Sequence, residues 1–132
     1  MTAADTNVVV RLLTGDHPVQ SSAARLLFAS GPVWIAKTVL LETDWVLRSL
    51  YGFDQSAVRN ALTRLLGLGN VHAEDEAVVA RALALTEQGI EFADALHLCS
   101  RPNGVSFVSF DGLLVRRARR AGVTEVSGVT TE

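Results

Sequence analysis

The stretch Val-Ser-Phe-Val-Ser-Phe-Asp at residues 105–111 decides the fold of this chain. Residues 105–110 are rich in valine and phenylalanine, which favour an extended strand, and the turn residues Arg-Pro-Asn-Gly at 101–104 precede them. Asp111 then begins a helix that Gly122 ends. A short strand that runs directly into a helix is the repeating unit of α/β domains with a parallel sheet.

The rest of the chain continues this alternation on either side of the stretch. Further strands are expected at the start of Thr2–Val10, at Val33–Ala36, at Asn70–His72 and at Glu125–Val126. Apolar residues at helical spacing predict helices at about Val8–Leu13, Val19–Ala29, Thr38–Tyr51, Asp54–Leu66, Asp75–Gly89 and Phe92–Ser100. We therefore expect an α/β fold with a mainly parallel sheet covered by helices on both faces. The length, 132 residues, predicts a single domain over residues 1–132.

Composition excludes several classes of protein. The net charge of −2 argues against a simple cationic nucleic-acid binder, so any contact with RNA must depend on local charge. Cys99 is the one cysteine, which excludes a disulfide framework and a thiolate metal site. The first ten residues hold no Lys or Arg, and no apolar run approaches the ~18 residues that span a bilayer. We expect a cytoplasmic protein without a membrane segment.

Four carboxylates stand where no cation is close in sequence. Glu42 lies in an apolar helix without Lys or Arg three or four positions away, and Asp94 shares a helix face with Glu91. Asp5 and Asp111 follow strands, and the carboxyl ends of parallel strands are where α/β domains bind ligands. Each of these two could alternatively serve only as a helix N-cap. Taken together, the four acids predict a site for a hard divalent cation, Mg²⁺ or the chemically similar Mn²⁺.

The expected last helix separates apolar from basic residues. At 100° per residue, Leu114, Val115, Ala118 and Ala121 form one face. The other face carries Arg116, Arg117, Arg119 and Arg120, about one turn beyond Asp111. This basic stripe is either an RNA-backbone contact or a solvated helix face.

Four short segments resemble the signature segments of PIN-domain ribonucleases, and most closely those of the VapC toxins of bacterial toxin–antitoxin pairs. These segments are Ala-Asp-Thr-Asn-Val at 4–8, Leu-Glu-Thr-Asp-Trp-Val-Leu at 41–47, Phe-Ala-Asp-Ala-Leu-His at 92–97 and Phe-Val-Ser-Phe-Asp at 107–111. Their order and spacing agree with the family over essentially the whole chain.

The resemblance implies a PIN-like three-layer sandwich whose central, mostly parallel sheet has five strands flanked by helices. It implies Mg²⁺- or Mn²⁺-dependent hydrolysis of RNA, with Asp5, Glu42, Asp94 and Asp111 as the catalytic, metal-binding acids. Thr6, Ser109 and Glu91 would support them. It also implies a homodimer held inactive by a cognate VapB-type antitoxin.

Two departures from the family pattern concern the metal site. Many relatives have aspartate where this chain has Glu91, and many carry a further acid just after the fourth one, where Gly112 and Leu113 stand here. The sequence therefore leaves open whether one or two metal ions bind.

Two other functions remain as alternatives. One is a catalytically silent PIN fold that binds RNA or protein. The other is a response-regulator phosphoacceptor domain, which requires adjacent acids after the first strand, where this chain has Thr6 and Asn7 after Asp5.

Overall fold

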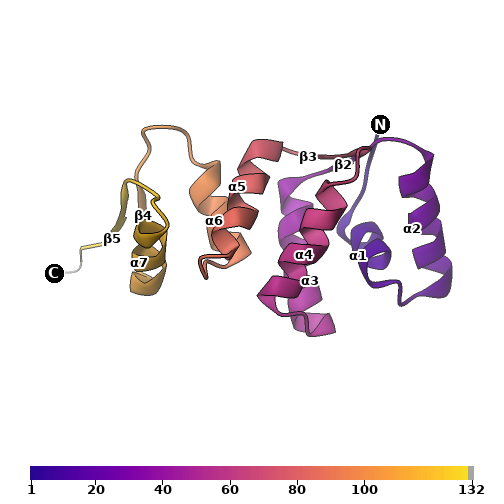
Figure 1. Ribbon diagram of the computed structural model, residues 1–132, viewed down its shortest axis with the longest axis horizontal. Helices are drawn as coiled ribbons and strands as arrows, with labels where there is room; N and C mark the ends of the chain where they lie inside the picture. Colours follow the sequence, from indigo (N-terminus) through magenta and orange to yellow (C-terminus); the bar gives the residue numbers. More distant parts are fainter. Residues whose placement is uncertain (131–132) are drawn as a thin grey trace. The chain divides into compact units, whose positions relative to one another are not determined.

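Short strands alternate with helices along residues 1–130, the part of the chain that the computed structural model describes (Figure 1). The strands are β1 (Thr2–Ala3), β2 (Val33–Ile35), β3 (Val71–Ala73), β4 (Phe107–Ser109) and β5 (Val126–Gly128). The helices are α1 (Thr6–Thr14), α2 (Pro18–Ser30), α3 (Lys37–Tyr51), α4 (Gln55–Leu66), α5 (Glu76–Thr86), α6 (Phe92–Ser100) and α7 (Gly112–Arg120). This order confirms the predicted α/β class. No helix in this described range has both the length and the apolar character needed to cross a membrane.

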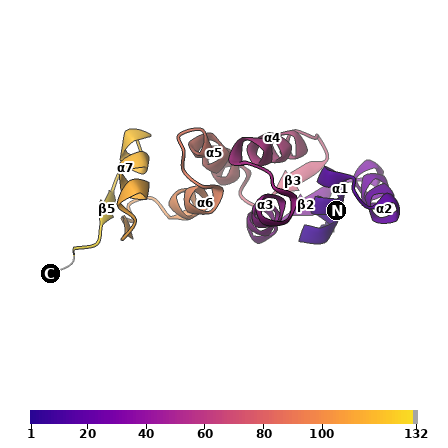
Figure 2. The ribbon, with the colours of Figure 1, turned by 90° about the horizontal axis from the view of Figure 1, so that it is seen from below.

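The chain divides into two compact units, and the first comprises residues 1–76. Its sheet has the order β1-β2-β3 with all strands parallel, and Val33 of β2 pairs with both Thr2 and Val71. Helices α1 and α2 pack side by side, as do α3 and α4 (Figure 2). The core of this unit consists of aliphatic side chains from β2 and the helices, among them Val9, Ile35, Leu40, Leu47 and Leu62.

The second unit begins at Ala77. Strands β4 and β5 pair in parallel, with Phe107 opposite Val126, and α7 packs against both strands. The buried face of α7 consists of Leu114, Val115 and Ala118, as the helical periodicity predicts, whereas Ala121, expected on the same face, is the half-buried C-cap residue. In α6 the buried residues are Phe92, Ala95, Leu96 and Leu98.

The prediction of one five-stranded sheet needs correction. All five strands are present, but hydrogen bonds join them into a parallel three-stranded sheet and a separate parallel two-stranded sheet. The strands are only two or three residues long. Apolar runs this short identify strands, but they do not say which strand edges pair.

Helix α3 contains a buried carboxylate. Asp44 exposes 2% of its surface, and Arg48 donates from Nε to Oδ1 and from Nη2 to Oδ2, both at 3.0 Å. A spacing of four residues on a helix favours such a pair, which most often lies at the protein surface. Helix α3 packs against both α1 and α4, and Asp44 is one of the buried residues of α3. The Asp44 carboxylate is therefore part of the core of the first unit, and Arg48 remains partly exposed.

Candidate functional site

The first unit brings Asp5 and Glu42 to one cavity. Asp5 directly precedes α1 as its N-cap, and its Oδ1 accepts a hydrogen bond from the Val8 N–H at 3.1 Å. Its second oxygen, Oδ2, accepts no hydrogen bond from the described residues. Thr6 Oγ1 donates a short hydrogen bond to Glu42 Oε1, which ties the first turn of α1 to α3. A cavity of about 520 Å³ is lined by Asp5, Thr6, Glu42 and, further along, by Val10, Arg11, Val46, Leu50 and Tyr51.

The second unit brings Asp94 and Asp111 to another cavity, of about 170 Å³. Asp111 is the N-cap of α7, and its Oδ1 accepts from the N–H groups of Leu113 and Leu114, both at 3.1 Å. Ser109 Oγ accepts the N–H of Asp111 at 2.9 Å, which fixes the turn between β4 and α7. Both expected N-caps are thus present, and each cap occupies only one oxygen of its carboxylate.

Negative charge is crowded around Asp94. This half-buried carboxyl lies in the first turn of α6, and its pKa is raised above the ordinary 3.8, chiefly because burial removes water from it. Repulsion from Glu91 and from Asp111 raises the pKa further, while His97 lowers it. Within the described residues, none of the four predicted acids forms an ion pair with Lys, Arg or His. A bound cation would relieve this repulsion.

The donor chemistry of both cavities fits a hard divalent cation. Each unit presents carboxylate oxygens in pairs, together with hydroxyl groups that hold the backbone or a carboxylate in place. In residues 1–130, no group of three or more His, Cys, Asp or Glu side chains is arranged as a complete metal cage. Mg²⁺ does not require such a cage, because it usually keeps several waters and binds one or two carboxylates. Asp5 with Glu42, and Asp94 with Asp111, are therefore the residues that could hold such an ion.

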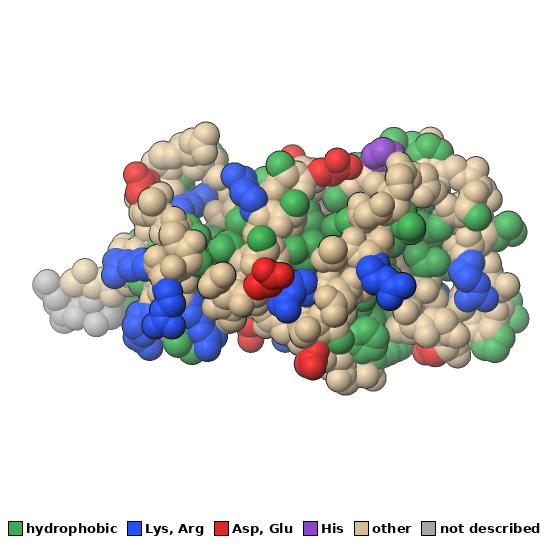
Figure 3. Space-filling model, in the orientation of Figure 1, with side chains coloured by type: hydrophobic (Ala, Val, Ile, Leu, Met, Phe, Trp, Pro, Cys, Tyr) green, Lys and Arg blue, Asp and Glu red, His purple; other side chains and the backbone are tan. Residues whose placement is uncertain are grey.

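The predicted arginines of α7 differ in their surroundings. Arg117 lines the cavity of Asp94 and Asp111, and its Nη1 donates to the carbonyl of Gly89 at 2.8 Å. Arg119 Nε donates to the carbonyl of Val126 at 2.9 Å, so it links α7 to β5. Arg116 and Arg120 are exposed. On the face drawn in Figure 3, basic side chains gather over α7.

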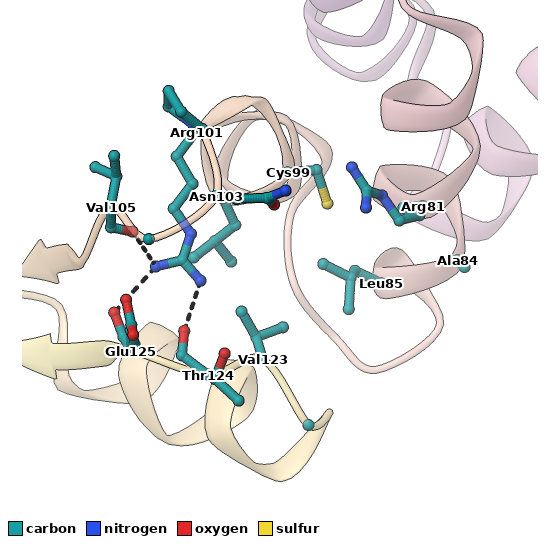
Figure 4. A pocket seen from close by; sticks show the side chains of 14 residues that line it. Arg81, Ala84, Leu85, Cys99, Arg101, Asn103, Val105, Val123, Thr124 and Glu125 are labelled. Carbon is teal, nitrogen blue, oxygen red and sulfur yellow. Dashed lines mark hydrogen bonds between the residues drawn. The ribbon is translucent and has the colours of Figure 1, made fainter.

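Another cavity of the second unit, of about 520 Å³, has a different character (Figure 4). Arg101 donates to the carbonyls of Val105, Thr124 and Glu125 at 2.6 to 3.0 Å, so its guanidinium joins two loops. Burial raises the pKa of the nearby Cys99 thiol, which disfavours the nucleophilic thiolate at neutral pH. This cavity therefore lacks an activated cysteine nucleophile.

Sequence reasoning missed two features near the acids. It named Gly89 only as the expected end of a helix and did not identify its carbonyl as the acceptor that holds Arg117. It also missed the network in which Asp16 Oδ2 accepts from the Tyr51 hydroxyl at 2.9 Å and Asp16 Oδ1 accepts from Arg11 at 3.1 Å. No local pattern indicates a contact between residues 16 and 51.

Comparison with known proteins identifies the family. The family model of the PIN domain matches residues 3–120. Among solved structures, the chain is similar to VapC20 of Mycobacterium tuberculosis, a toxin that cleaves the sarcin–ricin loop. The two chains are 24% identical over 96% of this chain and 98% of that one, with a TM-score of 0.45. No curated protein matches the chain. Because the family model covers most of its length, the chain belongs to the PIN domain family.

Proposed function

We propose that the protein is a divalent-metal-dependent ribonuclease that hydrolyses RNA phosphodiester bonds. Its catalytic, metal-binding residues would be Asp5 and Glu42 of the first unit and Asp94 and Asp111 of the second. The observation that carries the proposal is that a PIN-family chain presents these acids in pairs, with free oxygens and without a pairing cation. Carboxylates without a cationic partner do not stabilise the fold, but they are suitable ligands for a divalent ion.

Mg²⁺ or Mn²⁺ bound there would activate water and stabilise the charge that develops on the phosphate. The protein's own residues position the ligands. Asp5 and Asp111 are each fixed through one oxygen by cap hydrogen bonds, which leaves the other oxygen available. Thr6 orients Glu42 by donating to one of its oxygens, and Ser109 holds the backbone of Asp111. Glu91 adds negative charge next to Asp94 and thereby favours a cation.

The arginines of α7 would hold the RNA backbone beside the metal. Arg116, Arg117, Arg119 and Arg120 bring four positive charges to one helix of a chain whose net charge is −2. Phosphate contacts of this kind set the position of the RNA without reading its sequence.

The same proposal includes the biological setting. By similarity to VapC toxins, we infer a cytoplasmic toxin that acts as a homodimer and is inhibited by a VapB-type antitoxin. A catalytically silent PIN fold would not need to retain all four acids, and this chain does retain them. This retention favours the enzyme over the binding module.

Cleavage and metal binding measured on three matched variants test the proposal. We expect Asp5→Asn and Asp94→Asn, one in each unit, to abolish cleavage of total cellular RNA and to weaken Mn²⁺ binding measured by calorimetry. Asp54→Asn is the control, because Asp54 is also an exposed N-cap aspartate, which accepts the Ala57 N–H at 2.7 Å. If neither site variant weakens Mn²⁺ binding, the assignment of these acids as metal ligands is wrong. If both retain cleavage in RNase-free preparations, the nuclease assignment is wrong.

A further inference from the structure

One arginine of α7 is held inside the acidic cavity of the second unit. This cavity, of about 170 Å³, is lined by Glu91, Asp94 and Asp111 and by the half-buried side chain of Arg117. A cation among three acids would ordinarily form an ion pair with one of them. Arg117 does not do so, and its Nη1 donates instead to the carbonyl of Gly89 at 2.8 Å.

The conformation of Gly89 makes this contact possible. Gly89 has a φ of +81°, in the left-handed region that favours glycine. A Cβ at this position would lie 3.4 Å from Arg117 Nε and 3.5 Å from Arg117 Cζ, so the side chain packs directly over the glycine. The loop between α5 and α6 therefore provides both the hydrogen-bond acceptor and the space for the guanidinium.

The anchored guanidinium keeps most of its donors available. Arginine has five N–H donors in a planar arrangement, and the Gly89 carbonyl uses one of them. The remaining donors have no hydrogen-bond partner among the described residues. Because the side chain is already fixed, less entropy is lost when these donors bind a ligand. A planar, fixed, positively charged donor group matches the oxygens of a phosphate.

The other arginines of α7 lack this combination. Arg119 is bonded to Val126 of the neighbouring strand, whereas Arg116 and Arg120 are exposed and do not line the acidic cavity. Only Arg117, within the described chain, is both anchored and adjacent to Asp94 and Asp111.

From this arrangement we infer that Arg117 binds the phosphate group that is cleaved, while the other α7 arginines contact more distant phosphates. The inference rests on the proposed nuclease function and specifies one of its parts. Donors aimed at charge that develops during the reaction lower its barrier more than donors that bind the substrate alone. Arg117 is therefore expected to affect kcat, and Arg116 and Arg120 are expected to affect KM.

Steady-state kinetics of matched variants tests this assignment. The major cleavage site found in total cellular RNA would be placed in a fluorescent oligonucleotide. Arg117→Met should lower kcat about tenfold or more, and Arg117→Lys should restore part of the loss. Arg116→Met and Arg120→Met, which remove the same charge from the same helix, should change kcat less than about threefold and mainly raise KM in a salt-dependent manner.

Mn²⁺ affinity separates phosphate binding from a structural role. We expect Arg117→Met to bind Mn²⁺ within about twofold of the wild type, because Arg117 is not a ligand and a metal-ligand defect would cost about tenfold or more. A parallel loss of Mn²⁺ affinity would overturn the inference, since Arg117 would then only position the acids. Equal kcat losses in Arg116→Met and Arg117→Met would also overturn it. Full cleavage by Asp94→Asn would instead refute the nuclease proposal itself.

Gly89→Ala provides a second variant that leaves Arg117 in the chain. Its Cβ would meet the guanidinium in ordinary van der Waals contact, but alanine is strained at a φ of +81°, so the loop should relax and move the carbonyl that anchors Arg117. We expect the same direction of change as in Arg117→Met, namely a lower kcat with Mn²⁺ affinity retained. An unchanged kcat in a folded Gly89→Ala enzyme would count against the anchor.

Discussion

Substitution can separate the observed N-cap role of Asp5, which uses Oδ1, from its proposed role as a metal ligand, which would use Oδ2. The cap is a single hydrogen bond of 3.1 Å from the Val8 N–H to Oδ1 at an exposed position. Loss of such a cap costs about 1 kcal/mol, so Asp5→Ala should be destabilised by that amount. For a chain of 132 residues this corresponds to a decrease in Tm of about 4 °C.

Asp5→Asn should behave differently, since the asparagine carbonyl oxygen can accept the same N–H. We expect its free energy of unfolding to stay within about 0.5 kcal/mol of the wild type. The rate of RNA cleavage should fall about 100-fold or more in both variants. Mutating a residue that only supports a metal ligand already lowers metal affinity or activity by about 10- to 100-fold.

Urea unfolding without metal and RNA cleavage with Mn²⁺ measure the two effects independently. Asp54→Ala is the stability control. It removes the cap hydrogen bond of 2.7 Å from the Ala57 N–H to Asp54 Oδ1 at the start of α4 and should leave cleavage unchanged. The reasoning is refuted if Asp5→Asn cleaves RNA like the wild type. It is refuted equally if Asp5→Ala is as stable as the wild type while Asp54→Ala is not.

Three further predictions concern charge. The pKa of Asp94 is raised on folding, so its ionised form destabilises the metal-free protein at pH values above the ordinary pKa of 3.8. Asp94→Asn should therefore raise the Tm of the metal-free protein at pH 7. An equal or lower Tm would contradict this. The pKa of Asp16 is lowered, chiefly by the hydrogen bond from the Thr14 hydroxyl and next by that from Tyr51. The stabilising effect of the ionised Asp16 should therefore disappear as the pH falls below 3.8. The Tm of Asp16→Asn should depend less on pH in this acid range. Asp44→Asn should lower the free energy of unfolding, measured with urea, by about 2 kcal/mol, because it disrupts an ion pair whose carboxylate is buried and whose Arg48 partner is partly exposed. A loss below about 0.5 kcal/mol would show that the pair does not stabilise the fold.

The secondary structure could be predicted from the sequence because its causes are local. Helix periodicity, cap residues and turn glycines act within a few positions, and they located each helix to within a few residues; the largest difference is at the end of α5, which stops at Thr86 and not at Gly89. They also identified Leu114, Val115 and Ala118 as a buried face of α7. The same local reasoning placed Asp5 and Asp111 at the junctions between strands and helices, where the structure shows both as N-caps.

Contacts between distant parts of the chain depended on tertiary packing. Thr6 and Glu42 are 36 positions apart, Arg117 and Gly89 are 28 apart, and no periodic pattern encodes either hydrogen bond. The burial of Asp44 and the division of the strands into two sheets likewise follow from which surfaces pack together. Local sequence was enough to predict the helices, the strands and the acids at their ends, since these follow from short-range backbone chemistry. Only the tertiary structure decided which side chain supports which acid, because such contacts arise when helices distant in sequence bury their apolar faces together.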